Sequence, residues 1–193
     1  MRGKLNFLQK IGFLLVFLSL ALFLGFELVT AQNLKKTEKL AEKLESIFIH
    51  PVEGHPENYS NAVMPLLQLD GTDFVALMQA PAFGVSLPVG SEWSTENIYR
   101  YPCRFWGSAY DGSLVIGGTD GTGQLAFCGR LDLGDVITIT DMAGTQFTYE
   151  VVKIQRSSQA DSEKLLEGDW DLTLFVRDSS TLDYILVRCW FCT

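Results

Sequence analysis

The chain has 193 residues, which is enough for one folded domain with a short appendage. Hydrophobic residues make up 47% of it and charged residues 20%, so the sequence can bury a core and is not that of a disordered protein. From Pro51 onward there are 8 basic and 19 acidic residues, a net charge of −11. This excludes general nucleic-acid binding, which needs a basic surface. Both histidines, His50 and His55, precede the main body, so the body supplies no histidine base.

The N-terminus is basic and then strongly apolar. Residues 1–11 hold three basic side chains and no acid, Ile11 to Phe26 carries no charge, and the apolar run continues past Glu27 to Ala31. About 20 residues span a bilayer as a helix at about 1.5 Å per residue, and a basic flank keeps its end in the cytoplasm. We expect a single-pass protein of the cell membrane with an extracellular domain. The alternative is a signal peptide cleaved after Ala31, and either way the body is exported.

A helix and a linker are expected next. Asn33–Ile49 has the pattern of an amphipathic helix that packs on the domain or acts as a spacer, with a short coiled coil as the alternative. The proline-containing stretch from His50 to Asp70 reads as a linker. Two histidines and Glu53 in it could suggest a metal site, but adjacent prolines favour a solvated loop, and we expect no metal or cofactor. The predicted division is therefore 1–31, 32–71 and 72–193.

Short β-strands follow, several of which alternate apolar and polar residues. Seven are predicted in about 120 residues, separated by turn dipeptides such as Asp111-Gly112 and Ala143-Gly144, with one helical interruption at Ser158–Glu167. This density suggests a closed barrel or a sandwich. The predicted strands are Phe74–Gln79, Gly84–Pro88, Ser113–Gly117, Val136–Thr140, Gln146–Gln155, Trp170–Phe175 and Tyr184–Cys189.

These strands carry a family pattern. It lies in Leu87-Pro88-Val89, Pro102-Cys103-Arg104, Gly129-Arg130-Leu131 with Gly134-Asp135, Asp171 to Leu174, and Val187-Arg188-Cys189. In this order, over residues 72–190, the chain resembles the sortases, cysteine transpeptidases on the outer face of Gram-positive membranes, and most of all a clostridial-type subgroup. The resemblance implies a mainly β fold, a sortase-type closed barrel of about eight strands, behind an N-terminal membrane helix.

The resemblance also identifies three functional positions, and all three are substituted. Thr119 follows the strand Leu114–Gly118 where the family has histidine, Arg177 follows Thr173–Val176 where it has cysteine, and Tyr184 stands where it has arginine. Arginine is no nucleophile near neutral pH, threonine does not titrate there, and tyrosine lacks the positive charge. The sequence therefore predicts that no sortase-type catalytic group is intact.

The cysteines leave alternatives open. Cys128 could serve as a relocated nucleophile, although the body offers it no histidine partner, and a half-buried thiol is the plainer reading. The pair Cys189 and Cys192 has CxxC spacing but no following helix, and four cysteines lack the pairing of a zinc site. The glycine-rich loop Gly117–Gly123 lacks the lysine and helix of a phosphate-binding loop. From the subgroup's shared segments, a disulfide between Cys103 and Cys189 is also expected, with two reduced core thiols as the alternative.

Two functions of different class remain. The first is a membrane-anchored sortase-like pseudoenzyme that binds a surface protein, a sorting-signal peptide or an active sortase, with Arg177 placed to receive an acidic partner. The second is a divergent transpeptidase or hydrolase that acts on surface proteins through Cys128.

Overall fold

The computed structural model describes residues 7–48, 50–59, 62–121, 124–159 and 161–192. These form two compact units, residues 1–36 and 37–193, which are treated separately below. Helix α1, Phe7–Ile47, contains both the apolar stretch and most of the amphipathic stretch predicted at Asn33–Ile49. Its apolar stretch is long enough to cross a membrane, with a mean hydropathy of 2.4 over 18 residues.

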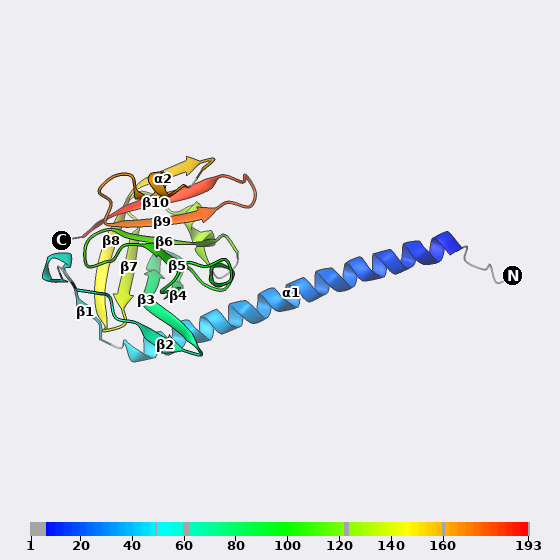
Figure 1. Cartoon of the computed structure of the whole chain (residues 1–193), viewed down its shortest axis with the longest axis horizontal. Helices are drawn as coiled ribbons and strands as arrows, with labels where there is room; N and C mark the ends of the chain where they lie inside the picture. Colours follow the sequence, from blue (N-terminus) through cyan, green and yellow to red (C-terminus); the bar gives the residue numbers. More distant parts are fainter. Residues whose placement is uncertain (1–6, 49, 60–61, 122–123, 160, 193) are drawn as a thin grey trace. The chain divides into compact units, whose positions relative to one another are not determined.

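The second unit is a mainly β structure (Figure 1). All seven predicted strands are present, with bounds within two residues of those predicted. Strand β5 was not predicted, because four residues after a proline give no alternation to detect. The strands are β1 Val52–Glu53, β2 Leu67–Leu69, β3 Thr72–Ala80, β4 Val85–Gly90, β5 Cys103–Trp106, β6 Leu114–Thr119, β7 Val136–Asp141, β8 Thr145–Ser157, β9 Leu172–Arg177 and β10 Tyr184–Phe191.

Eight of these strands close into a barrel. The ladder runs β8-β10-β9-β6-β5-β4-β3, and β7 pairs with both β3 and β8 to complete the circle. The short strands β1 and β2 lie in the stretch predicted as linker and add to β8 and β3. Closure leaves no free edge among the eight strands, so every backbone ladder finds a partner.

Helical turns connect the strands. The helix predicted at Ser158–Glu167 is a single five-residue turn, α2, Ser162–Leu166, with Asp161 accepting a hydrogen bond from Lys164 N at 2.9 Å as its N-cap. The remaining turns are 3₁₀ helices: η1 Pro56–Tyr59, η2 Pro81–Phe83, η3 Asn97–Tyr99 and η4 Leu125–Arg130.

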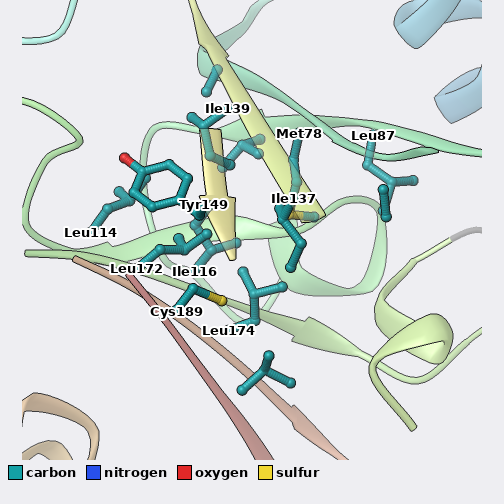
Figure 2. Packing of buried hydrophobic residues seen from close by; sticks show 14 of the residues in the cluster. Met78, Leu87, Leu114, Ile116, Ile137, Ile139, Tyr149, Leu172, Leu174 and Cys189 are labelled. Atoms are coloured by element: carbon teal, nitrogen blue, oxygen red, sulfur yellow. The ribbon is translucent and has the colours of Figure 1, made fainter. Parts of the chain in front are cut away.

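The barrel interior is a core of packed apolar side chains (Figure 2). Because side chains alternate along a strand, every second residue points inward. In β6, β9 and β10 the inward set is Leu114, Ile116, Leu172, Leu174, Val176, Ile185, Val187 and Cys189, all of them buried. About the last three turns of α1 pack on the outside of the barrel. There Ala41 and Leu44 pack with Leu77, and Thr37 Oγ1 donates to the Arg100 carbonyl at 3.0 Å. The C-terminal part of the predicted amphipathic helix thus packs on the domain.

Candidate functional site

The outward-pointing residues of β6, β9 and β10 form the candidate site, called here the outer face. The pairing register places them in three cross-strand rows, since β6 runs parallel to β9 and β10 runs antiparallel to it. The first row is Thr119, Arg177 and Tyr184; the middle row is Gly117, Phe175 and Leu186; the third row is Val115, Thr173 and Arg188.

The first row brings together the three residues singled out from the sequence. Thr119 pairs with Arg177, and Arg177 pairs with Tyr184. Neighbouring strands lie about 4.8 Å apart, so the whole row spans about 10 Å. The Arg177 guanidinium lies over the Tyr184 ring, 5.9 Å from its centroid. The row is a threonine, an arginine and a tyrosine side by side at the ends of three strands.

Arg177 forms no ion pair with a carboxylate among the described residues. Two acidic residues that follow the strand ends of the first row have other partners: Asp178 accepts from Arg156 Nη1 at 2.9 Å, and Asp120 accepts from Ser179 N at 2.6 Å. Among the described residues Arg177 is in neither of the two ion pairs, and its side chain donates only a long 3.5 Å bond to the Leu182 carbonyl. The exposed guanidinium is therefore free to bind an anionic group.

The middle row is filled by the protein's own aromatic side chains. Trp93, Phe105 and Phe175 contact one another with ring centroids 5.2–5.5 Å apart. They occupy the space over Gly117, where an added Cβ would lie 2.2 Å from Phe175 Cζ and 2.6 Å from Trp93 Cζ3. From α2, Leu165 packs beside them. The outer face is consequently closed in the middle and accessible at its two ends.

The third row holds a buried arginine. Arg188 is 2% exposed, and its guanidinium donates to the carbonyls of Leu165 and Lys164 at 2.7 and 2.6 Å and to Thr173 Oγ1 at 2.8 Å. Burial lowers the pKa of Arg188, an effect that nearby Glu167 opposes. Its Nε has no hydrogen-bond partner. Arg188 thus clamps α2 onto the strands.

The four cysteines are free, and none of them belongs to the first row. Cys128, in η4, is 1% exposed, and burial, with a smaller effect of nearby Cys189, raises the pKa of its thiol. Burial raises the pKa of Cys103 and of Cys189 to about 12. It also raises the pKa of half-buried Cys192. Thiolates, the nucleophilic form, are therefore disfavoured at all four positions.

The disulfide expected between Cys103 and Cys189 is wrong. Cys103 is on β5 and Cys189 on β10, with β6 and β9 between them. Three strand spacings of about 4.8 Å exceed the roughly 4.4–6.8 Å Cα separation of a disulfide. The two thiols belong instead to different packed clusters, one with Phe74 and Tyr101 and the other in the barrel interior.

Neither histidine reaches the first row. The His55 ring contacts Phe191, with centroids 5.9 Å apart, at the end of β10 opposite to Tyr184. Seven residue steps along a strand amount to about 23 Å. His50 precedes β1, which pairs with β8 at Thr145, beyond that same end. Over the described ranges, no group of three or more histidine, cysteine or acidic side chains is arranged to hold a metal.

The architecture defines a closed eight-stranded β-barrel whose outer face carries the site, and the comparison with solved structures shows that this is the sortase fold. Sortase D5 of Clostridium perfringens is similar over 81% of this chain and 98% of its own, with a TM-score of 0.59 and 19% identity. Sortase C1 of Streptococcus suis is similar over 62% and 73%, with a TM-score of 0.53 and 19% identity. The C. perfringens sortase C solved with its C-terminal cell wall sorting motif has a TM-score of 0.54, 16% identity and coverage of 85% and 88%. No family model and no curated protein matches the chain.

Two features of the site escaped sequence reasoning. Trp93 lies in a loop without alternation, so nothing in the sequence places its ring over Gly117. Arg188 was noted only as part of a motif, although an arginine between apolar strand residues signals a buried, hydrogen-bonded cation.

Proposed function

We propose that the protein is a membrane-anchored, extracytoplasmic sortase-like protein that does not catalyse transpeptidation and instead binds a partner at the cell surface. The observation that carries this proposal is the first row. Threonine, arginine and tyrosine lie side by side in it, and the resemblance to sortases assigns to these three positions the base, the thiol nucleophile and the cation of a sortase-type reaction.

The surroundings of the first row support the proposal that the protein does not catalyse transpeptidation. A nucleophile needs a base within hydrogen-bond reach, and both histidines lie at the far end of the barrel. Cys128, the candidate for a relocated nucleophile, is enclosed in the core and favours its neutral thiol. A substrate carbonyl could not approach it without opening the barrel.

Binding is supported by the accessible end of the outer face. Arg177 is exposed and unpaired with carboxylates, and a hollow of about 160 Å³ adjoins the row between β9, β10 and η4. Its lining combines Leu125, Val176 and Ile185 with the acidic residues Asp120 and Asp178. This combination suits a peptide segment that places a hydrogen-bond-donating side chain in the hollow and a carboxylate on Arg177. The partner would be a surface protein, its sorting-signal peptide or an active sortase.

A site-specific photocrosslinker tests the proposal on intact cells. Placed at Thr119 of the full chain, it should capture one defined surface partner, and Arg177→Glu should abolish the capture. The same crosslinker at exposed Leu133, outside the outer face, is the matched control. Equal capture from both positions, or capture that survives Arg177→Glu, would contradict a binding role for the row.

A further inference from the structure

The loop between β9 and β10 holds a leucine in an unfavourable backbone conformation. Leu182 has a φ of 64°, in the left-handed region where the Cβ of an ordinary residue lies too close to the following carbonyl oxygen. The other non-glycine residue with a positive φ in the described part of the chain is Asp70, which precedes Gly71 in the turn between β2 and β3. Aspartate tolerates this region because its short polar side chain can hydrogen-bond locally, and leucine has no such compensation.

The side chain of Leu182 is left in solvent as well. It is 60% exposed and belongs to none of the hydrophobic clusters that the described residues form. The strained backbone and the exposed apolar side chain both disfavour the folded state. Backbone strain of this kind concentrates at positions where function, rather than stability, determines the residue.

Hydrogen bonds brace the loop in this conformation. Asp178 Oδ1 accepts from the Ser180 N–H at 2.9 Å, and Asp120 Oδ2 accepts from the Ser179 N–H at 2.6 Å. The Leu182 N–H donates to the Asp178 carbonyl at 2.8 Å, so the left-handed residue ends a hydrogen-bonded turn. Glycine and asparagine are the usual residues at such an end. A leucine there is held in a fixed place at the surface of the domain.

Leu182 lies directly beside the cation of the first row. Its carbonyl accepts a hydrogen bond from Arg177 Nε at 3.5 Å. Arg177 is exposed and forms no ion pair with a carboxylate among the described residues. This end of the outer face therefore presents a cation that suits an acidic group and, next to it, an apolar side chain without an apolar partner.

We propose that Leu182 is a specificity-determining residue, which contacts an apolar side chain of a bound peptide whose neighbouring acidic residue binds Arg177. This inference rests on the function proposed above and deepens it, because it names the chemistry of the partner: a large apolar residue beside an aspartate or glutamate. Asparagine or glycine at position 182 would relieve the strain but remove the apolar contact. The braced loop also favours binding, since little conformational entropy is lost when it meets the peptide.

Four acetylated and amidated peptides test the inference with the full chain in lipid nanodiscs. They share a glycine–serine sequence and carry Leu-Glu, Leu-Gln, Ser-Glu or Ser-Gln at its centre. Saturation-transfer NMR titrations give the dissociation constant of each peptide. The Leu-Glu peptide should bind about tenfold or more tightly than each of the other three, because it alone combines the burial of a leucine side chain with a charge-assisted hydrogen bond.

Variants assign the two parts of this preference to two residues. Leu182→Asn should weaken the binding of the Leu-Glu peptide about tenfold and leave that of the Ser-Glu peptide unchanged. Its Tm should not fall, because asparagine tolerates the left-handed region. Leu133→Asn makes the same change at an exposed leucine outside the outer face and should leave peptide binding unchanged. Arg177→Glu should abolish the binding of both glutamate-containing peptides.

The outcomes separate this inference from the function on which it rests. Unchanged binding of the Leu-Glu peptide by Leu182→Asn, or a fall in its Tm of more than about 2 °C, would overturn the inference alone, since Leu182 would then serve the fold or nothing. Glutamate-dependent binding that survives Arg177→Glu would overturn the peptide site proposed for the first row together with the inference. No binding of any of the four peptides at millimolar concentration would overturn the inference, and the crosslinking experiment would still decide the proposed function.

Discussion

Replacement of Gly117 by alanine tests whether the middle of the outer face is filled. The added Cβ would lie 2.2 and 2.4 Å from two atoms of the Phe175 ring and 2.6 Å from Trp93. Real Cβ atoms do not come this close, and Phe175 is held by Trp93, Phe105 and Leu165. The rings must therefore move.

The expected cost follows from two opposing effects. Overpacking a filled site lowers the free energy of unfolding by about 1–3 kcal/mol. Replacing a strand glycine by alanine raises it by about 0.5–1 kcal/mol, because alanine loses less backbone entropy on folding. The free energy of unfolding should fall by about 1–2 kcal/mol, which lowers the Tm of a domain of this size by about 2–8 °C. The double variant with Phe175→Leu should lose less stability than the two single variants predict together.

Urea unfolding of the full chain, followed by tryptophan fluorescence, measures the effect. Gly129→Ala is the matched control, because its Cβ would meet only Ile185 Cδ1 at an ordinary 3.6 Å. If Gly117→Ala is as stable as the wild type and the Trp93 emission is unchanged, the aromatic rings do not cover Gly117 and the outer face is open.

Three further predictions concern the thiols, an ion pair and the membrane topology. Burial raises the pKa of Cys103 and Cys189 to about 12, against about 8.5 in an unfolded chain. The stability from these two buried thiols is therefore full below about pH 8.5 and should fall as the pH rises toward 12. A thiol reagent should label one cysteine rapidly in the native protein, Cys192, and all four in urea, and rapid labelling of more than one in the native protein would contradict this. The Arg156 guanidinium and, to a smaller extent, the hydrogen bonds from Ser180 hold the pKa of Asp178 well below its usual range. The stability that the Arg156–Asp178 pair adds is therefore present above about pH 3.9 and lost as the pH falls. Arg156→Gln should raise the pKa of Asp178 in an NMR titration, and an unshifted curve would exclude the pair in solution. Protease added to intact protoplasts should remove the domain that follows the apolar helix, and full protection would refute the extracytoplasmic placement.

The barrel could be predicted from local sequence because its strands alternate. Thr145–Ser157 buries every second residue over its first half, and Val136–Asp141 alternates apolar and polar residues in sequence although five of its six residues are buried. The turn between them has Gly144 at a positive φ, as the Ala143-Gly144 dipeptide suggests. Strand β9 is different, because Leu172–Val176 is buried on both faces and shows a continuous apolar run. The extra coverage comes from Trp93 and Leu165, which are distant in sequence.

The first row could be predicted from sequence because it depends on strand ends and register. The disulfide prediction failed for the opposite reason: two cysteines in shared motifs need not be adjacent, and only the strand order shows that β5 and β10 are separated. The packing of α2 on the third row could not be foreseen either. Arg188 of β10 donates to the carbonyls of Leu165 and Lys164 in α2, and no short motif records that these segments meet.

The most direct test of the central claim is the search for an acyl-enzyme intermediate. The full chain is incubated with a panel of sorting-type peptides, with and without an amine acceptor, and its intact mass is measured alongside that of an active sortase. The account predicts no peptide adduct and no cleavage for the wild type. An adduct on any residue of the wild type, above all one on Cys128 that Cys128→Ala removes, would contradict it.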